Sequence, residues 1–135
     1  MNRLEFLLLA KTQYNIQSPF LFRLYSDVIS PRLSRQQLRS LSIKSSDRYS
    51  QLRFKLCDHL HLSPAPNTST HRAELFLMSD GSSVGLIQSP HRSSSSESEW
   101  KSIVRSPDVT LTVDLFYAGL FFTSAKLSKQ HFLLR

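Results

Sequence analysis

The spacing of the hydrophobic residues changes from a helical to a strand period about halfway along the chain, and this change limits the fold more than any other feature. In the first half, apolar residues lie three and four positions apart, as in Leu21–Val28. In the second half they alternate with threonines, as in Val109–Val113. A stretch rich in Pro, Ser and Thr separates the two patterns. We therefore expect an N-terminal helical region 1–61, a linker 62–72 and a region of strands and one helix at 73–135.

Helix-start signals divide the first half into separate helices. Ser18 precedes a proline, which combines a capping hydroxyl with a residue that needs no amide donor at the first helical position. Ser34 with Gln37 has the spacing of a capping box, and Asp47 can cap the helix that follows it. These signals predict helices that begin near residues 19, 35 and 48.

The second half predicts strands around one helix. Asp80-Gly81 is typical of a hairpin turn between two short strands. The run Ser93–Ser96 is typical of a flexible loop, and Pro107 ends the helix that follows. Within that helix Trp100 lies at helical spacing from aliphatic residues, so we expect it in the core rather than exposed for stacking on a ligand.

Length and composition exclude several classes of protein. A chain of 135 residues suits one small domain with one core. The apolar run Phe6–Ala10 is far shorter than the ~20 residues that a membrane-spanning helix needs, so we expect no membrane association. Only three glycines are present, too few for a glycine-rich phosphate or dinucleotide loop. The single cysteine, Cys57, excludes an internal disulfide, and we expect a cytoplasmic protein.

Positive charge is concentrated in the first half of this basic chain. The formal net charge is +7, and residues 1–60 hold ten Lys and Arg against four Asp and Glu. Such a field is typical of a surface that binds RNA or an acidic partner, although it is also found on solvated helices. The candidate residues for polyanion binding are Arg32, Arg35, Arg39, Lys44, Arg48 and Lys55.

The side chains with reactive groups do not form a recognisable catalytic or metal-binding motif. His59 and His61 are two residues apart, which places them on different faces of a helix. Cys57 lies on an apolar helix stripe, where a cysteine is usually a small hydrophobic residue. Asp114 ends a predicted strand, a position that serves active sites in α/β proteins, but it stands alone. The sequence therefore predicts no catalytic, cofactor-binding or metal-ligating residue.

Two stretches of the chain resemble one protein family. Residues 14–22, Tyr-Asn-Ile-Gln-Ser-Pro-Phe-Leu-Phe, are similar to the segment His-Gly-Ile-His-Ser-Pro-Phe-Val-Phe of a group of bacterial class I S-adenosylmethionine-dependent methyltransferases. Residues 109–135 resemble the closing strands of that group, through Val-Thr-Leu-Thr-Val-Asp-Leu-Phe, Gly-Leu-Phe-Phe and Lys-Gln-His-Phe-Leu-Leu-Arg. The helix around Trp100 is similar to the last crossover helix of the family, between its fifth and sixth strands.

The resemblance implies a Rossmann-like sheet, transferase chemistry and S-adenosylmethionine as cofactor. The family places a strand and a glycine-rich turn after its leading helix, and then a carboxylate for the ribose of the cofactor. Here Leu60 leads into the Pro-rich linker, and no Glu/Asp-x-Gly-x-x-Gly pattern follows. The chain is thus expected to be α/β, or α+β, with N-terminal helices packed on a small, incomplete Rossmann-like methyltransferase sheet that ends in a C-terminal antiparallel strand pair.

Two functions remain open at this point. The first is a degenerate methyltransferase-like protein that lacks a competent cofactor site and is non-catalytic or dependent on a partner chain. The second is a basic module that binds RNA or another polyanion, or a structural interaction module. An incomplete sheet also predicts an unpaired apolar edge, which we place near Phe121 and Phe122. A homo-oligomer or a partner chain is expected to cover that edge.

Overall fold

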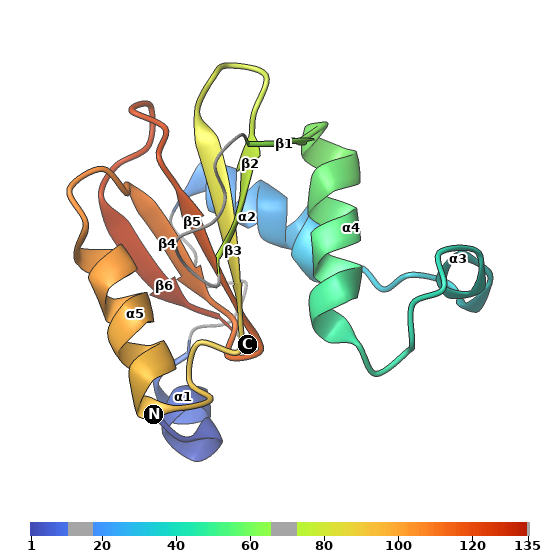
Figure 1. Cartoon of the computed structure of the whole chain (residues 1–135), viewed down its shortest axis with the longest axis horizontal. Coiled ribbons are helices and arrows are strands. Elements are labelled where there is room, and N and C mark those ends of the chain that lie inside the picture. Colours follow the sequence, from blue (N-terminus) through green and yellow to red (C-terminus); the bar gives the residue numbers. More distant parts are fainter. Residues whose placement is uncertain (11–17, 66–72, 135) are drawn as a thin grey trace.

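A six-stranded mixed sheet carries helices on both faces (Figure 1). The structure is a computed structural model, and it describes residues 1–10, 18–65 and 73–134. The strands are β1 (Ser63–Pro64), β2 (Glu74–Leu77), β3 (Ser83–Gln88), β4 (Leu111–Asp114), β5 (Ala118–Phe122) and β6 (Gln130–Leu133). The protein is therefore a mixed α/β protein, as the change of hydrophobic period predicts.

The order of the strands is β1-β2-β3-β5-β4-β6. All neighbouring strands are antiparallel except β4 and β6, which are parallel. The expected C-terminal antiparallel pair is β4 with β5, and β6 adds a parallel neighbour to it. Because β5 is antiparallel to both β3 and β4, the strands β3, β4 and β6 all point the same way. Their carboxyl ends therefore meet at one edge of the sheet.

The described residues form six helical segments, and local caps explain where several of them begin. They are α1 (Arg3–Leu9), α2 (Pro19–Leu24), the π-helical turn η2 (Tyr25–Ile29), α3 (Arg35–Ser40), α4 (Arg48–Leu60) and α5 (Ser94–Arg105). The side chains of Ser18, Ser34 and Asp47 accept hydrogen bonds from the backbone amides three residues later. The predicted helix starts at residues 19, 35 and 48 are confirmed.

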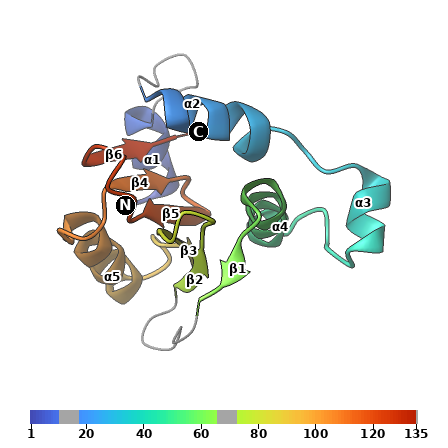
Figure 2. The same cartoon turned by 90° about the horizontal axis from the view of Figure 1, so that it is seen from above.

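Helices on opposite faces of the sheet enclose two separate groups of buried residues (Figure 2). The larger group joins Leu21 of α2, Leu52 and Leu56 of α4, and sheet residues such as Leu120. The smaller group surrounds Trp100 of α5, which is 3% exposed. Trp100 is thus a core residue, as its spacing predicts. Helix α3 buries no residue and projects away from the sheet in both views.

The serine run forms the start of α5 and not a flexible loop. Ser93 is the cap, and its side chain accepts a hydrogen bond from the backbone amide of Ser96. Ser96 itself is 2% exposed, in the first turn of the helix. The prediction of a loop was wrong because a serine with a free hydroxyl at the cap position stabilises a helix start as well as it tolerates a loop.

Two glycines allow the aromatic side chains of the smaller core to lie against the sheet. A Cβ on Gly119 would lie 2.7 Å from the Trp100 ring, and a Cβ on Gly85 would lie 1.9 Å from the ring of Phe121. Neither position has room for a methyl group without movement of its neighbours. These glycines serve packing, which is a different use from the cofactor turns in which glycines are often found.

The unpaired edge expected near Phe121 and Phe122 does not exist, because β5 is an interior strand. It lies between β3 and β4, and the exposed fractions of Phe121 and Phe122 are 7% and 0%. The two edges of the sheet are β1 and β6. A partner strand would therefore have to join the sheet at one of those two strands.

The structure describes only part of the predicted linker 62–72. Ser63–Pro64, within the expected linker, form the edge strand β1, while 66–72 lie outside the described residues. Residues 11–17, which include part of the first resembling segment, also lie outside them. Within the described ranges, every helix is too short or too polar to cross a lipid bilayer.

Candidate functional site

A cavity of about 580 Å³ opens at the carboxyl ends of β4 and β6, which we call the basic cavity. In α/β sheets this is the edge at which ligands usually bind. The residues that directly follow these strands, 115–117 and 134, form one part of its wall. The other lining residues are Arg3, Phe6, Leu7, Tyr25, Ile29, Ser30, Pro31, Arg32, Ser45, Arg48, Gln51 and Lys55.

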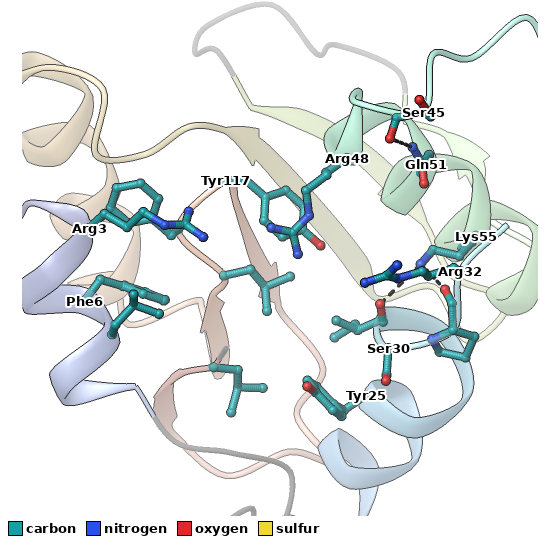
Figure 3. A pocket seen from close by; sticks show the side chains of 16 residues that line it. Arg3, Phe6, Tyr25, Ser30, Arg32, Ser45, Arg48, Gln51, Lys55 and Tyr117 are labelled. Atoms are coloured by element: carbon teal, nitrogen blue, oxygen red, sulfur yellow. Dashed lines mark hydrogen bonds between the residues drawn. The ribbon is translucent and has the colours of Figure 1, made fainter. Parts of the chain in front are cut away.

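The charged groups of the basic cavity are all positive. Arg3, Arg32, Arg48 and Lys55 line it, and no Asp or Glu is found among its described lining residues. Figure 3 shows Arg32 and Lys55 together on one side, Arg3 and Phe6 on the opposite side, and Arg48 with Tyr117 between them. Four cations around one cavity repel each other, so this arrangement favours an anion.

Arg48 is held over the ring of Tyr117. Its guanidinium carbon lies 4.1 Å from the centre of the ring, which is the distance of a cation–π contact. Burial raises the pKa of the Tyr117 hydroxyl, and Arg48 opposes that rise. Tyr117 therefore stays neutral at physiological pH. A guanidinium held by one face still presents N–H donors along its edge, which is the geometry that binds a phosphate or carboxylate.

Lys55 is fixed from the opposite side of the cavity. Its ammonium donates hydrogen bonds to the carbonyl oxygens of Ile29, at 3.2 Å, and Pro31, at 2.7 Å. These carbonyls lie at and beyond the end of η2, where backbone acceptors lack helical partners. Burial lowers the pKa of Lys55, and the charge of Arg48 lowers it further. Two carbonyl oxygens thus stabilise the charge of Lys55, while burial and Arg48 destabilise it.

The contrast with Arg53, on the same helix, shows that α4 does neutralise some of its cations. Arg53 Nε donates to Glu74 Oε2 at 2.7 Å, and the same carboxylate accepts the Tyr49 hydroxyl through Oε1 at 2.9 Å. Arg48 has no such carboxylate among the described lining residues, although it occupies the first position of α4, where the helix dipole disfavours a cation. The helix dipole thus opposes the charge of Arg48, and a bound anion would relieve that repulsion.

The structure brings together three of the six predicted polyanion-binding residues. Arg32, Arg48 and Lys55 line the basic cavity. Arg35 and Arg39 lie on α3 and Lys44 follows it; all three are exposed and outside the cavity. The sequence did not predict Arg3, Tyr25 or Tyr117 as residues of this cavity. Tyr117 had a usable signal, because it follows the strand that ends at Asp114; Arg3 and Tyr25 had none.

A second polar cluster lies next to this cavity, around the buried carboxylate of Asp114. Asp114 is 2% exposed and accepts three hydrogen bonds. His91 Nε2 lies 2.5 Å and Trp100 Nε1 3.1 Å from Oδ2, and the backbone amide of Phe116 lies 2.9 Å from Oδ1. We call these four residues the Asp114 centre. The sequence marked Asp114 and Trp100 separately and gave no sign that they touch.

The Asp114 centre shapes the wall of the basic cavity. Phe116 has a backbone φ of 70°, a left-handed conformation that a non-glycine residue adopts only when its surroundings hold it there. Its amide is bound by Asp114 and its ring stacks on His91, with 5.4 Å between the ring centres. These contacts fix the turn that carries Tyr117 into the cavity. His91 Nδ1 is buried without a hydrogen bond, 3.7 Å from Glu97 Oε1.

Cys57, His59 and His61, the other reactive side chains singled out by the sequence, do not come together in the described structure. Burial raises the pKa of the Cys57 thiol, which disfavours the nucleophilic thiolate. His59 and His61 are exposed on α4 and just after it. Among the residues with a described position, no three His, Cys, Asp or Glu side chains group closely enough to hold a metal ion.

Comparison of the chain with protein-family models, curated proteins and solved structures gives no match. The geometry of the basic cavity and the Asp114 centre therefore provides the basis for a function.

Proposed function

We propose that this protein binds RNA through the basic cavity, on a methyltransferase-like scaffold that does not itself use S-adenosylmethionine. The observation that carries the proposal is the group of four cations around one cavity with no carboxylate among its described lining residues. Phosphate groups are the ligands that such a set of Arg and Lys residues recognises. An RNA chain supplies several of them in a row.

The exposed cations of α3 extend this surface beyond the cavity. Arg35, Arg39 and Lys44 lie along the chain between Arg32 and Arg48, both of which line the cavity. Helix α3 projects from the body of the protein, so its charges are accessible to a long ligand (Figure 1). A single strand seated in the cavity would meet further positive charge on α3.

The connection of the strands supports the methyltransferase-like scaffold. β3 and β4 are parallel, α5 connects them, and β5 lies between them in the antiparallel direction. The resemblance assigns the helix around Trp100 to the family's crossover between its fifth and sixth strands. A crossover helix between two parallel strands, followed by an inserted antiparallel strand, agrees with that assignment.

The residues around the cavity do not fit S-adenosylmethionine. This cofactor carries a positive sulfonium, which the four cations would repel, and ribose hydroxyls, for which the described lining offers no carboxylate. The three glycines of the chain are also used elsewhere. Gly85 and Gly119 accommodate Phe121 and Trp100, and Gly81 lies in the hairpin turn. A partner chain would have to supply the cofactor site.

The proposal is tested by the salt dependence of RNA binding. Fluorescence anisotropy with a labelled single-stranded RNA should show affinity that falls steeply with salt, with a log–log slope of about −0.7 for each phosphate contacted. Arg48→Gln should weaken binding and reduce the slope by about one contact. The matched control is Arg105→Gln, the same charge change on α5. Absence of salt-dependent binding at low ionic strength would refute the RNA function.

The cofactor part of the proposal has its own measurement. Calorimetric titration with S-adenosylmethionine should give no heat of binding beyond dilution. Micromolar binding by the isolated chain would show that a competent site exists, and would contradict the non-catalytic assignment while leaving RNA binding intact.

A further inference from the structure

The two sides of the basic cavity differ in chemistry. Arg32 and Lys55 lie on one side, and Phe6 lies with Arg3 on the other, with Arg48 and Tyr117 between them (Figure 3). Leucine side chains complete the lining: Leu7, Leu115 and Leu134. An occupant that matches this lining has a strongly negative group at one end and a flat or apolar body at the other.

The volume of the cavity limits the size of that occupant. About 580 Å³ lies within the range of pockets that enclose one small molecule, roughly 300–1,000 Å³. One nucleotide unit suits this range, whereas a longer segment of RNA would have to continue outside, towards α3. The size of the cavity therefore suits a single nucleotide better than a strand enclosed over several units.

The number of cations favours a terminal phosphate over an internal one. At pH 7 a phosphate monoester carries a charge of about −1.5 to −2, while each internal phosphodiester carries a single charge. Arg48 and Lys55 are close enough for the charge of Arg48 to lower the pKa of Lys55, so a dianion between them relieves that repulsion. Lys55 is also held in place by two backbone carbonyls.

We propose that the basic cavity is a binding site for a nucleoside phosphate monoester, with the phosphate between Arg32, Arg48 and Lys55 and the nucleoside towards Phe6. This proposal rests on the anion-binding role of the cavity proposed above. The monoester can be a free mononucleotide or the phosphorylated end of an RNA, because the two present the same chemistry to the cavity.

Calorimetry at low salt with AMP, inorganic phosphate and adenosine tests the two halves of the site. AMP should bind more tightly than phosphate, and adenosine should show no measurable binding. Arg48→Gln should weaken AMP binding by about tenfold or more, since a charge-assisted contact is lost. Arg105→Gln, the same charge change on α5, should leave AMP binding within about twofold. Circular dichroism confirms that each variant is folded.

A matched pair of RNA oligonucleotides distinguishes the two sources of the monoester. If the natural ligand is an RNA end, a 5′-phosphorylated oligonucleotide should bind at least about tenfold more tightly than its 5′-hydroxyl counterpart. If it is a free nucleotide, AMP should bind and the two oligonucleotides should bind equally. Either result supports the site.

Salt-dependent RNA binding with no AMP binding and no preference for the 5′-phosphate would overturn this inference and leave the RNA function standing. AMP binding without any RNA binding would have the opposite meaning: the nucleotide site would hold and the RNA function would fail. If neither AMP nor RNA binds, both proposals are refuted.

Discussion

The Asp114 centre and the basic cavity meet at one turn, residues 115–117, and differ in how their charged groups are neutralised. Asp114 is buried and receives three hydrogen bonds from within the chain, from His91, Trp100 and the Phe116 amide. The basic cavity collects four cations and has no carboxylate among its described lining residues. The charge of Asp114 is stabilised by groups of the protein itself, whereas the positive charges of the basic cavity are available to a ligand.

The difference indicates which residues stabilise the fold and which are available for binding. A buried carboxylate is tolerated only when donors surround it, so the groups around Asp114 depend on one another. Cations at a solvated cavity contribute little to stability on their own. Removing a side chain that bonds Asp114 should therefore destabilise the fold, while removing one of the four cations of the cavity should mainly change binding.

The largest effect is expected from Trp100→Ala. Trp100 fills the smaller core and donates to Asp114, so its loss leaves both a cavity and an unpaired acceptor. The free energy of unfolding should fall by about 3–5 kcal/mol, measured by urea denaturation. Trp100→Phe, which keeps most of the ring, should lose less. An unchanged denaturation midpoint in Trp100→Ala would contradict the assignment of α5 to the core.

A smaller loss of stability is expected from Asp114→Asn. The amide keeps the size of the side chain but presents an NH₂ group where Asp114 now accepts from Trp100 and His91. The free energy of unfolding should fall by about 1–3 kcal/mol. The exposed Asp108→Asn serves as the control and should stay within about 0.5 kcal/mol of the wild type. Equal effects of the two substitutions would contradict the claim that the hydrogen bonds to Asp114 stabilise the fold.

The pH dependence of AMP binding examines Lys55. Because burial and Arg48 lower its pKa, Lys55 loses its proton at a lower pH than an ordinary lysine. Affinity should therefore fall as pH rises from 8 to 10, where the AMP phosphate stays fully ionised. A guanidinium group in general keeps its proton over this range, and the raised pKa of Tyr117 keeps its hydroxyl neutral for longer.

Two variants test whether the pH dependence comes from Lys55. Lys55→Arg should make the affinity independent of pH over this range, since a guanidinium does not lose its proton. Tyr25→Phe should keep the wild-type profile. If Tyr25→Phe abolishes the pH dependence of AMP binding and Lys55→Arg does not, the pH dependence does not come from Lys55 and this account is refuted.

The smallest effect on stability is expected from Arg48→Gln without a ligand. Arg48 stacks on Tyr117, but it lies at the start of α4, where the helix dipole opposes its charge. These contributions offset each other, so the free energy of unfolding should change by no more than about 0.5 kcal/mol. Thermal denaturation measures it. A loss as large as that of Asp114→Asn would remove the contrast between the two regions.

Local signals in the sequence were sufficient for some elements of secondary structure and not for others. Ser18, Ser34 and Asp47 mark helix starts that the structure contains, because a cap depends on neighbouring residues only. The core position of Trp100 followed from helical spacing in the same way. The serine run was misread because serine at Ser93 suits both a loop and a helix cap, and the choice depends on whether the helix that follows can pack.

Long-range pairing is what the sequence could not specify. Phe121 and Phe122 were expected at an open edge, but β5 is inserted between β3 and β4, a pairing that depends on the whole sheet. The contacts of Asp114 with His91 and Trp100, which lie 23 and 14 residues earlier in the chain, likewise depend on tertiary packing.

The sequence by itself determined the helix starts, the strand period and the basic character of the first half, because each depends on residue type and short spacing. Only the tertiary structure decided that Arg3 from α1 joins Arg32, Arg48 and Lys55, while Arg35, Arg39 and Lys44 remain outside. The physical reason is that a cavity forms where separate elements pack, and no local pattern of charge records which elements meet.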